Sequence, residues 1–202
     1  TIKKVYILLS LTLIFSAMTA WISVVINSQP FGFYIILIYI FMLYIINISK
    51  NNFFGIIFTF LLTGFLGYTL GPIFNKIIQG YADGKLIIAM SLSITSMIFI
   101  LLSLYAFLSK KRFNYIIVFL STGIIVILTL IILAIILKIQ LLQLVISYFI
   151  IIISCGFILY ETSDIIHNTK QNYILATITI YIQIFNILTS VLYIFSYNTK
   201  KD

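Results

Sequence analysis

Charged residues are scarce in this sequence. Only 8% of its 202 residues are Asp, Glu, Lys or Arg, whereas soluble domains average roughly 25%. Hydrophobic residues make up 63% of the chain. This balance excludes an ordinary soluble domain. It predicts an all-α membrane protein, a single polytopic domain over residues 1–202 with little mass outside the lipid bilayer.

Residues for covalent, redox and metal chemistry are nearly missing as well. The one cysteine, Cys155, cannot form an intrachain disulfide, and its place in an apolar run is typical of a small packed residue. The one histidine, His167, falls in a polar turn, and the chain has no HExxH, CxxC or glycine-rich phosphate loop. Intramembrane proteolysis would need a Ser–His pair, two membrane aspartates or a metal site. We therefore expect no enzyme and no cofactor.

A net charge of +8 remains. The basic residues stand between apolar runs and do not form a patch with spaced aromatics, so they indicate membrane topology and not nucleic-acid binding. The hydrophobic runs predict seven transmembrane helices, although six or eight are also compatible with the short and broken runs. The predicted spans cover approximately residues 5–26, 31–48, 53–78, 86–108, 115–137, 141–167 and 173–197.

The first span allows two interpretations. Ala17-Met-Thr-Ala20 resembles a signal-peptidase site, but the apolar run continues past it, which favours an uncleaved helix. The absence of an initial Met suggests that a short N-terminal tail has been trimmed. With a cytoplasmic N-terminus, seven basic residues fall inside (Lys3, Lys4, Lys50, Lys110, Lys111, Arg112, Lys170) and five outside (Lys76, Lys85, Lys138, Lys200, Lys201). This bias predicts an N-terminus in the cytoplasm and a C-terminus in the periplasm.

Small residues recur every four positions in the third span. Thr59, Thr63, Gly67 and Gly71 form a ridge that lets a neighbouring helix backbone approach closely. Pro72 follows directly and should kink or end this helix, although the apolar residues after it can continue the span. We interpret the ridge as a packing surface.

Acidic residues inside apolar sequence mark the most informative segment, residues 156–186, which we call the polar hairpin. Glu161 and Asp164 precede a turn near residues 168–172, after which an apolar run resumes. Ionisable groups in a membrane helix are functional candidates by default. Counted from the turn, Glu161 and Gln183 lie equally far along antiparallel helices, so we expect them to face each other. Asp164 and His167 can share one helical face, but two residues do not make a metal site.

The last predicted span carries a polar stripe. Thr179, Gln183, Asn186 and Ser190 follow a 4-3-4 spacing that places them on one face. Such a stripe turns toward protein or water. The alternative is that it only supplies hydrogen bonds between helices, each worth ~0.6 kcal/mol.

Three segments together resemble the Bax-inhibitor (TMBIM) family, and most closely its bacterial YccA-type branch. They are Phe65-Leu-Gly-Tyr-Thr-Leu-Gly-Pro72, Tyr160-Glu-Thr-Ser-Asp-Ile-Ile166 and the stretch from Asn172 to Asn186. The resemblance covers nearly the whole chain. It implies six helices around a central C-terminal helix in the bacterial inner membrane.

The resemblance also implies two functions. Calcium-leak members of the family use a pair of aspartates as a pH sensor, and these match Glu161 and Gln183. Because Gln183 is neutral at every pH, it cannot share a proton, although Asp164 can supply a second carboxylate. Calcium prefers 6–8 oxygen ligands with substantial negative charge, so we expect at most a weak Ca²⁺ site.

The YccA-type branch implies instead a partner of the membrane-bound ATP-dependent protease FtsH, engaged through the N-terminal tail. We expect this interaction role ahead of a pH-dependent calcium or cation leak with Glu161 as sensor. A structural protein whose polar hairpin only fixes packing is the third possibility.

Overall fold

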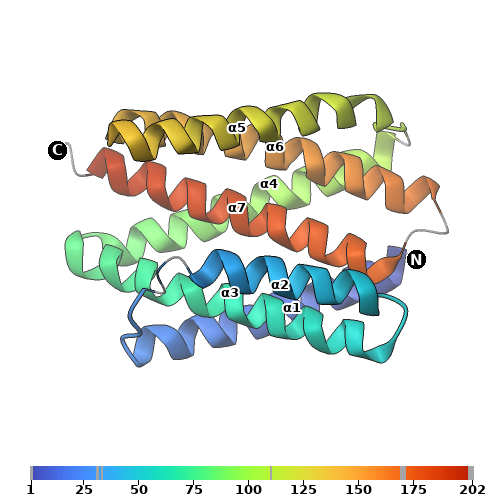
Figure 1. The fold of residues 1–202 in the computed structure, drawn as a ribbon, viewed down its shortest axis with the longest axis horizontal. Helices are drawn as coiled ribbons and strands as arrows, with labels where there is room; N and C mark the ends of the chain where they lie inside the picture. The colour runs from blue at the N-terminus through green and yellow to red at the C-terminus, as the bar shows by residue number, and fades with distance from the viewer. Residues whose placement is uncertain (1, 31, 33, 110, 169–171, 200–202) are drawn as a thin grey trace. The chain divides into compact units, whose positions relative to one another are not determined.

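Seven α-helices account for almost all of the chain that the structure describes. The structure, a computed structural model, describes residues 2–30, 32, 34–109, 111–168 and 172–199, and this part contains no strand. One 3-10 turn, η1 (Asn114–Ile116), precedes the fifth helix. The helices are α1 (Ile2–Val25), α2 (Tyr34–Ser49), α3 (Phe53–Gly80), α4 (Gly84–Ser109), α5 (Ile117–Leu137), α6 (Gln140–His167) and α7 (Tyr173–Thr199) (Figure 1).

Six of these helices are long and apolar enough to cross a membrane. The remaining one, α2, has 16 residues and a length of about 24 Å, somewhat less than the ~30 Å of a bilayer's hydrocarbon core. It begins at Tyr34 and not at the predicted Phe31, because Gly32, two residues after Pro30, is a poor helix former. Phe31, Phe33, Lys110 and Lys170 lie outside the described residues. The protein is an all-α membrane protein.

Helix α3 runs through Pro72 without ending. Proline has no N–H, so the carbonyl oxygen four residues earlier, that of Tyr68, loses its usual donor. The Ser23 hydroxyl of α1 donates a hydrogen bond to this oxygen at 2.7 Å. A neighbouring side chain thus replaces the missing backbone bond, which is how membrane helices tolerate an internal proline.

Contacts divide the chain into two compact units. The first contains Thr1–Gly84 and Lys170–Tyr181, and within it α3 packs against both α1 and α2. Thr59, Thr63, Gly67 and Gly71 are all buried. A Cβ atom on Gly67 would collide with the carbonyl oxygen of Ser16, and one on Gly71 would collide with Ser23. The glycine part of the small-residue ridge, Gly67 and Gly71, therefore lies against α1.

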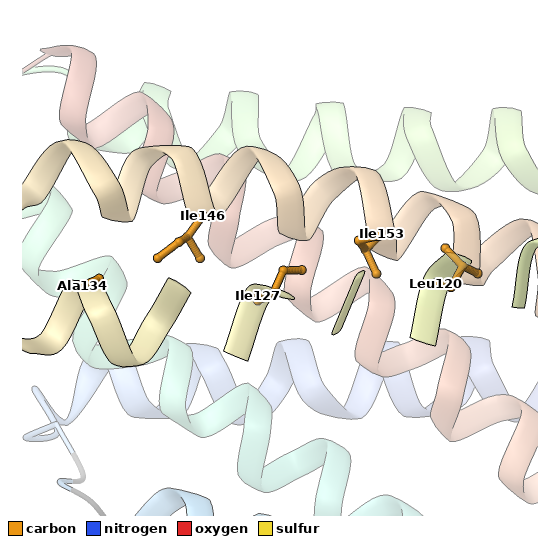
Figure 2. Close-up of a cluster of buried hydrophobic side chains, with 5 residues drawn as sticks. All are labelled: Leu120, Ile127, Ala134, Ile146 and Ile153. Atoms are coloured by element: carbon orange, nitrogen blue, oxygen red, sulfur yellow. The ribbon is translucent and has the colours of Figure 1, made fainter. Parts of the chain in front are cut away.

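The second unit contains Lys85–Thr169 and Ile182–Asp202, so that successive parts of α7 belong to different units. Within it, α5 and α6 lie side by side and are joined by a tight turn with Lys138 in the left-handed conformation. Their contact consists of residues spaced by seven: Leu120, Ile127 and Ala134 on α5, and Ile146 and Ile153 on α6 (Figure 2). This spacing is that of a coiled-coil seam. The arrangement of six helices around α7 stays a prediction.

The bond at Pro72 yields a testable prediction. Ser23→Ala leaves the Tyr68 carbonyl without its donor and should lower the free energy of unfolding by on the order of 1 kcal/mol. In a Pro72→Ala background the new N–H of residue 72 can bond this oxygen, so the same substitution should cost less. Unfolding of the detergent-solubilised variants measures both costs.

Ser10→Ala serves as the control, because Ser10 is exposed and bonds only the Tyr6 carbonyl of its own helix. An equal cost of Ser23→Ala in both backgrounds would contradict this account.

Candidate functional site

Glu161 is a carboxylate buried inside a membrane helix. Its side chain is only 7% exposed, and the next two residues of α6, Thr162 and Ser163, are buried as well. It lies six residues before the end of α6, or about 9 Å along the helix axis. An ionisable group in this position is costly to bury and is therefore a candidate for function.

An apolar cluster within the second unit shows which residues of α6 and α7 lie at the same level along the two helices. Ile158 of α6 packs with Ile187 and Val191 of α7, and α4 covers them with residues such as Ile98 and Leu102. Thr162 follows Ile158 by one turn, and Gln183 precedes Ile187 by one turn. Because α6 and α7 are consecutive helices with a short connection, both positions lie on the connection side of the cluster.

Gln183 is half-buried, as is Asn186. The cluster places Gln183 at about the level of Glu161 and Thr162. The direct approach of Gln183 to Glu161 stays a prediction. Of the rest of the polar stripe, Ser190 is buried, and Thr179 is half-buried and bonds the Leu175 carbonyl of its own helix. Thr179 belongs to the first unit, so the stripe is divided between the units.

Three hydroxyl groups of the second unit are buried without a hydrogen-bond partner among the described residues. They are the Oγ1 of Thr162 on α6, the Oγ of Ser103 on α4 and the Oγ of Ser196 on α7. Ser103 follows Phe99, a member of the apolar cluster, by one turn. Unsatisfied buried hydroxyls are uncommon in native proteins and call for an explanation. Hydroxyl oxygens of this kind can accept a hydrogen bond or contribute a ligand to a cation.

Ser163 joins α6 to the connection between α4 and α5. Its hydroxyl donates to the Lys111 carbonyl at 2.8 Å and accepts from the buried Phe113 N–H at 3.3 Å. Sequence reasoning missed this role, because a serine that bonds irregular backbone 50 residues away leaves no periodic signal. The two bonds hold the connection against the end of α6.

Asp164 and His167 occupy the last turn of α6, and both are half-buried. His167 Nδ1 lies 2.8 Å from the Ser163 carbonyl oxygen, so this nitrogen carries the proton and donates it. Among the described residues, no group of three His, Cys, Asp or Glu side chains could hold a metal ion.

A second polar centre lies in the first unit and was not predicted. Tyr181 of α7 is buried, and its hydroxyl lies 2.6 Å from the Ser16 hydroxyl and donates to the Thr63 carbonyl at 3.0 Å. One phenol thereby joins α1, α3 and the first part of α7. A tyrosine in an apolar run gave no sign of this in the sequence.

Comparison with known proteins decides the family. The sequence profile described as "Bax1-I: Inhibitor of apoptosis-promoting Bax1" matches residues 1–200. The chain belongs to the Bax-inhibitor family. It is 38% identical over 201 residues to "Modulator of FtsH protease YccA" of Escherichia coli, covering 98% of this chain and 90% of the relative.

Two further relatives show the breadth of the match. An "Uncharacterized membrane protein" of Vibrio cholerae is 32% identical over 203 residues, covering 100% of this chain and 91% of the relative. A "Golgi anti-apoptotic protein" of vaccinia virus is 30% identical over 120 residues, covering 57% and 49%. The three segments on which the sequence resemblance rested thus belong to a true family member.

The role of Ser163 can be tested directly. Ser163→Ala leaves the buried Phe113 N–H unpaired, which should lower the free energy of unfolding by about 1–3 kcal/mol. It should also speed hydrogen exchange of the backbone amides at residues 111–117. Mass spectrometry of the exchanged protein measures this locally.

Ser96→Ala is the matched control, because Ser96 is exposed on α4 and bonds only Leu92 of its own helix. If exchange in the 111–117 segment were the same in both variants, the bond network would not hold this connection.

Proposed function

We propose that this chain is a multi-pass inner-membrane protein that binds the membrane-bound protease FtsH and modulates its action on membrane proteins. The observation that carries the proposal is the 38% identity, over 98% of the chain, to a protein named for that role. A second relative carries the name "Inner membrane protein YccA", which supports the location.

The form of the molecule supports a partner that is itself anchored in the membrane. The connections between helices are short, and α5 exposes apolar side chains along its length, among them Val118, Ile125 and Ile136. Most of the surface available to a partner is therefore lipid-facing helix. A protease with its own membrane segments can reach such a surface, whereas a soluble partner cannot.

For the orientation, we propose a cytoplasmic N-terminus and a periplasmic C-terminus. The excess of basic residues on the side of Lys3, Lys4 and Arg112 supports it. It requires the 16-residue α2 to cross the bilayer, which a locally thinned membrane allows. The connection between α6 and α7 then faces the cytoplasm, the side on which ATP is available to the protease.

A second candidate function is a pH-dependent calcium or cation leak with Glu161 as its sensor. It is favoured by the burial of Glu161 beside the unpartnered Thr162 hydroxyl. Gln183 and Asn186 would contribute amide oxygens, and Asp164 a second carboxylate. This donor set carries little negative charge, so Ca²⁺ would bind weakly. Neither function involves catalysis, and we propose that the protein is not an enzyme and needs no cofactor.

The protease proposal predicts an effect in a reconstituted system. In liposomes containing FtsH and a membrane-protein substrate, adding this chain should slow degradation in a saturable manner, because the chain occupies the protease. Glu161→Gln should slow degradation equally, since a buried acid plays no part in docking. Substrate decay on gels measures the effect.

The control replaces the chain by an unrelated helical membrane protein in the same amount. No co-purification with FtsH from detergent, together with unchanged substrate decay, would overturn the proposal.

The leak function makes a separate prediction. Proteoliposomes of the wild type should release Ca²⁺ at a rate that differs between pH 6 and pH 8, and Glu161→Gln should remove this difference, because a glutamine does not titrate. Asp83→Asn, which changes an exposed acid between α3 and α4, should keep it. A fluorescent calcium indicator measures the flux.

No flux above that of empty liposomes would exclude the leak. The same pH-dependent flux in Glu161→Gln would exclude Glu161 as the sensor.

A further inference from the structure

A polar recess lies at the end of α6, about one helical turn beyond the buried Glu161. It has a volume of about 250 Å³ and is lined by Arg112, Asn114, Asp164, His167 and Asn168, all within the second unit. Two of these residues come from the connection between α4 and α5, and three from the last turn and cap of α6. The bonds from Ser163 to Lys111 and Phe113 hold the two walls together.

The recess carries opposite charges in one space. Arg112 supplies a guanidinium and Asp164 a carboxylate, and these two described side chains form no ion pair with each other. An anion alone would meet the Asp164 carboxylate, and a metal cation would meet the Arg112 guanidinium. A ligand that itself carries both charges would satisfy both side chains.

Aromatic residues beside the recess indicate its position along the bilayer normal. The rings of Tyr105, Phe113 and Tyr115 pack in series beside Arg112 and Asn114, with centroids 6.0 Å and 6.3 Å apart. Tyr105 and Tyr115 are exposed. Exposed tyrosines at helix ends are typical of the lipid headgroup level.

Apolar surface continues from the recess toward the bilayer core. Leu108 on α4 and Val118 and Phe119 on α5 are exposed near these helix ends. Acyl chains attached to a headgroup in the recess would have an apolar surface to lie against.

We propose that this recess binds a zwitterionic phosphate–ammonium group, the phosphoethanolamine headgroup of a membrane phospholipid. The Arg112 guanidinium takes the phosphate, to which a planar fork of N–H donors is well suited. The Asp164 carboxylate accepts hydrogen bonds from the primary ammonium, and the His167 side chain lines the same space. Basic pockets between membrane helices bind the phosphates of lipid headgroups, and this recess adds a carboxylate to such a basic group.

The arrangement implies selectivity among phospholipids. Phosphatidylcholine carries a quaternary ammonium without N–H donors, so it cannot hydrogen-bond Asp164. Phosphatidylglycerol has no cation and leaves Asp164 facing only neutral hydroxyls and the phosphate. Phosphatidylethanolamine alone of these three satisfies both ends of the recess.

Native mass spectrometry of the detergent-solubilised protein tests the proposal. With equal amounts of phosphatidylethanolamine, phosphatidylcholine and phosphatidylglycerol added, the wild type should retain phosphatidylethanolamine preferentially. Asp164→Asn should reduce this retention about tenfold relative to phosphatidylglycerol, since it removes a charged hydrogen-bond acceptor. Arg112→Gln should reduce retention of both lipids.

The controls are Asp83→Asn and Lys138→Gln, which change the same kinds of charge in the connections from α3 to α4 and from α5 to α6. Both should retain phosphatidylethanolamine like the wild type. Thermal unfolding checks that Asp164→Asn and Arg112→Gln remain folded; both changes are at residues that are not buried.

Soluble phosphoethanolamine and inorganic phosphate serve as competitors. Displacement of the lipid by soluble phosphoethanolamine but not by phosphate supports recognition of both charges. If the protein bound soluble phosphoethanolamine but retained no phosphatidylethanolamine, the ligand would be the free compound and not a lipid headgroup, and the proposal would be wrong. Equal retention of all three lipids, or no loss in Asp164→Asn, would overturn the proposal itself.

Discussion

Inside a bilayer every backbone N–H and C=O must find a partner within the protein, because lipid offers none. The long helices satisfy most of these groups by themselves. Where a helix leaves a backbone group without a partner, a side-chain hydroxyl forms the hydrogen bond instead. Ser23 bonds the carbonyl left over by Pro72, and Ser163 bonds both Lys111 and Phe113 where the chain is irregular between α4 and α5. These two hydroxyls satisfy backbone groups at an internal proline of α3 and in the irregular segment beside the end of α6.

The fold was largely predictable because its signals are periodic and strong. Long apolar runs interrupted by charges predicted the helical membrane class, and the four-residue spacing of Gly67 and Gly71 indicated a close helix approach. The effect of Pro72 was harder to predict. Whether a proline ends a helix depends on a donor elsewhere in the chain, and Ser23 lies 45 residues away from Tyr68.

The candidate site was predictable only in part. Glu161 stood out because an acid in an apolar run is rare, and the structure buries it. Tyr181 and Ser163 did not stand out, since tyrosine and serine are common in membrane helices and their roles depend on distant backbone atoms. The charged recess escaped notice for a related reason: Arg112 and Asp164 are separated by 52 positions and belong to no motif.

Helix α5 combines two very different demands on its sequence. Its inward positions, Leu120, Ile127 and Ala134, must fit the facing side chains of α6, so their size matters. Its outward positions, such as Ile125 and Ile136, are exposed. Where such a position meets fluid acyl chains and not a protein partner, it requires an apolar residue but no particular shape. The fold therefore constrains the shape of the inward residues of α5, but only the polarity of the residues that face lipid.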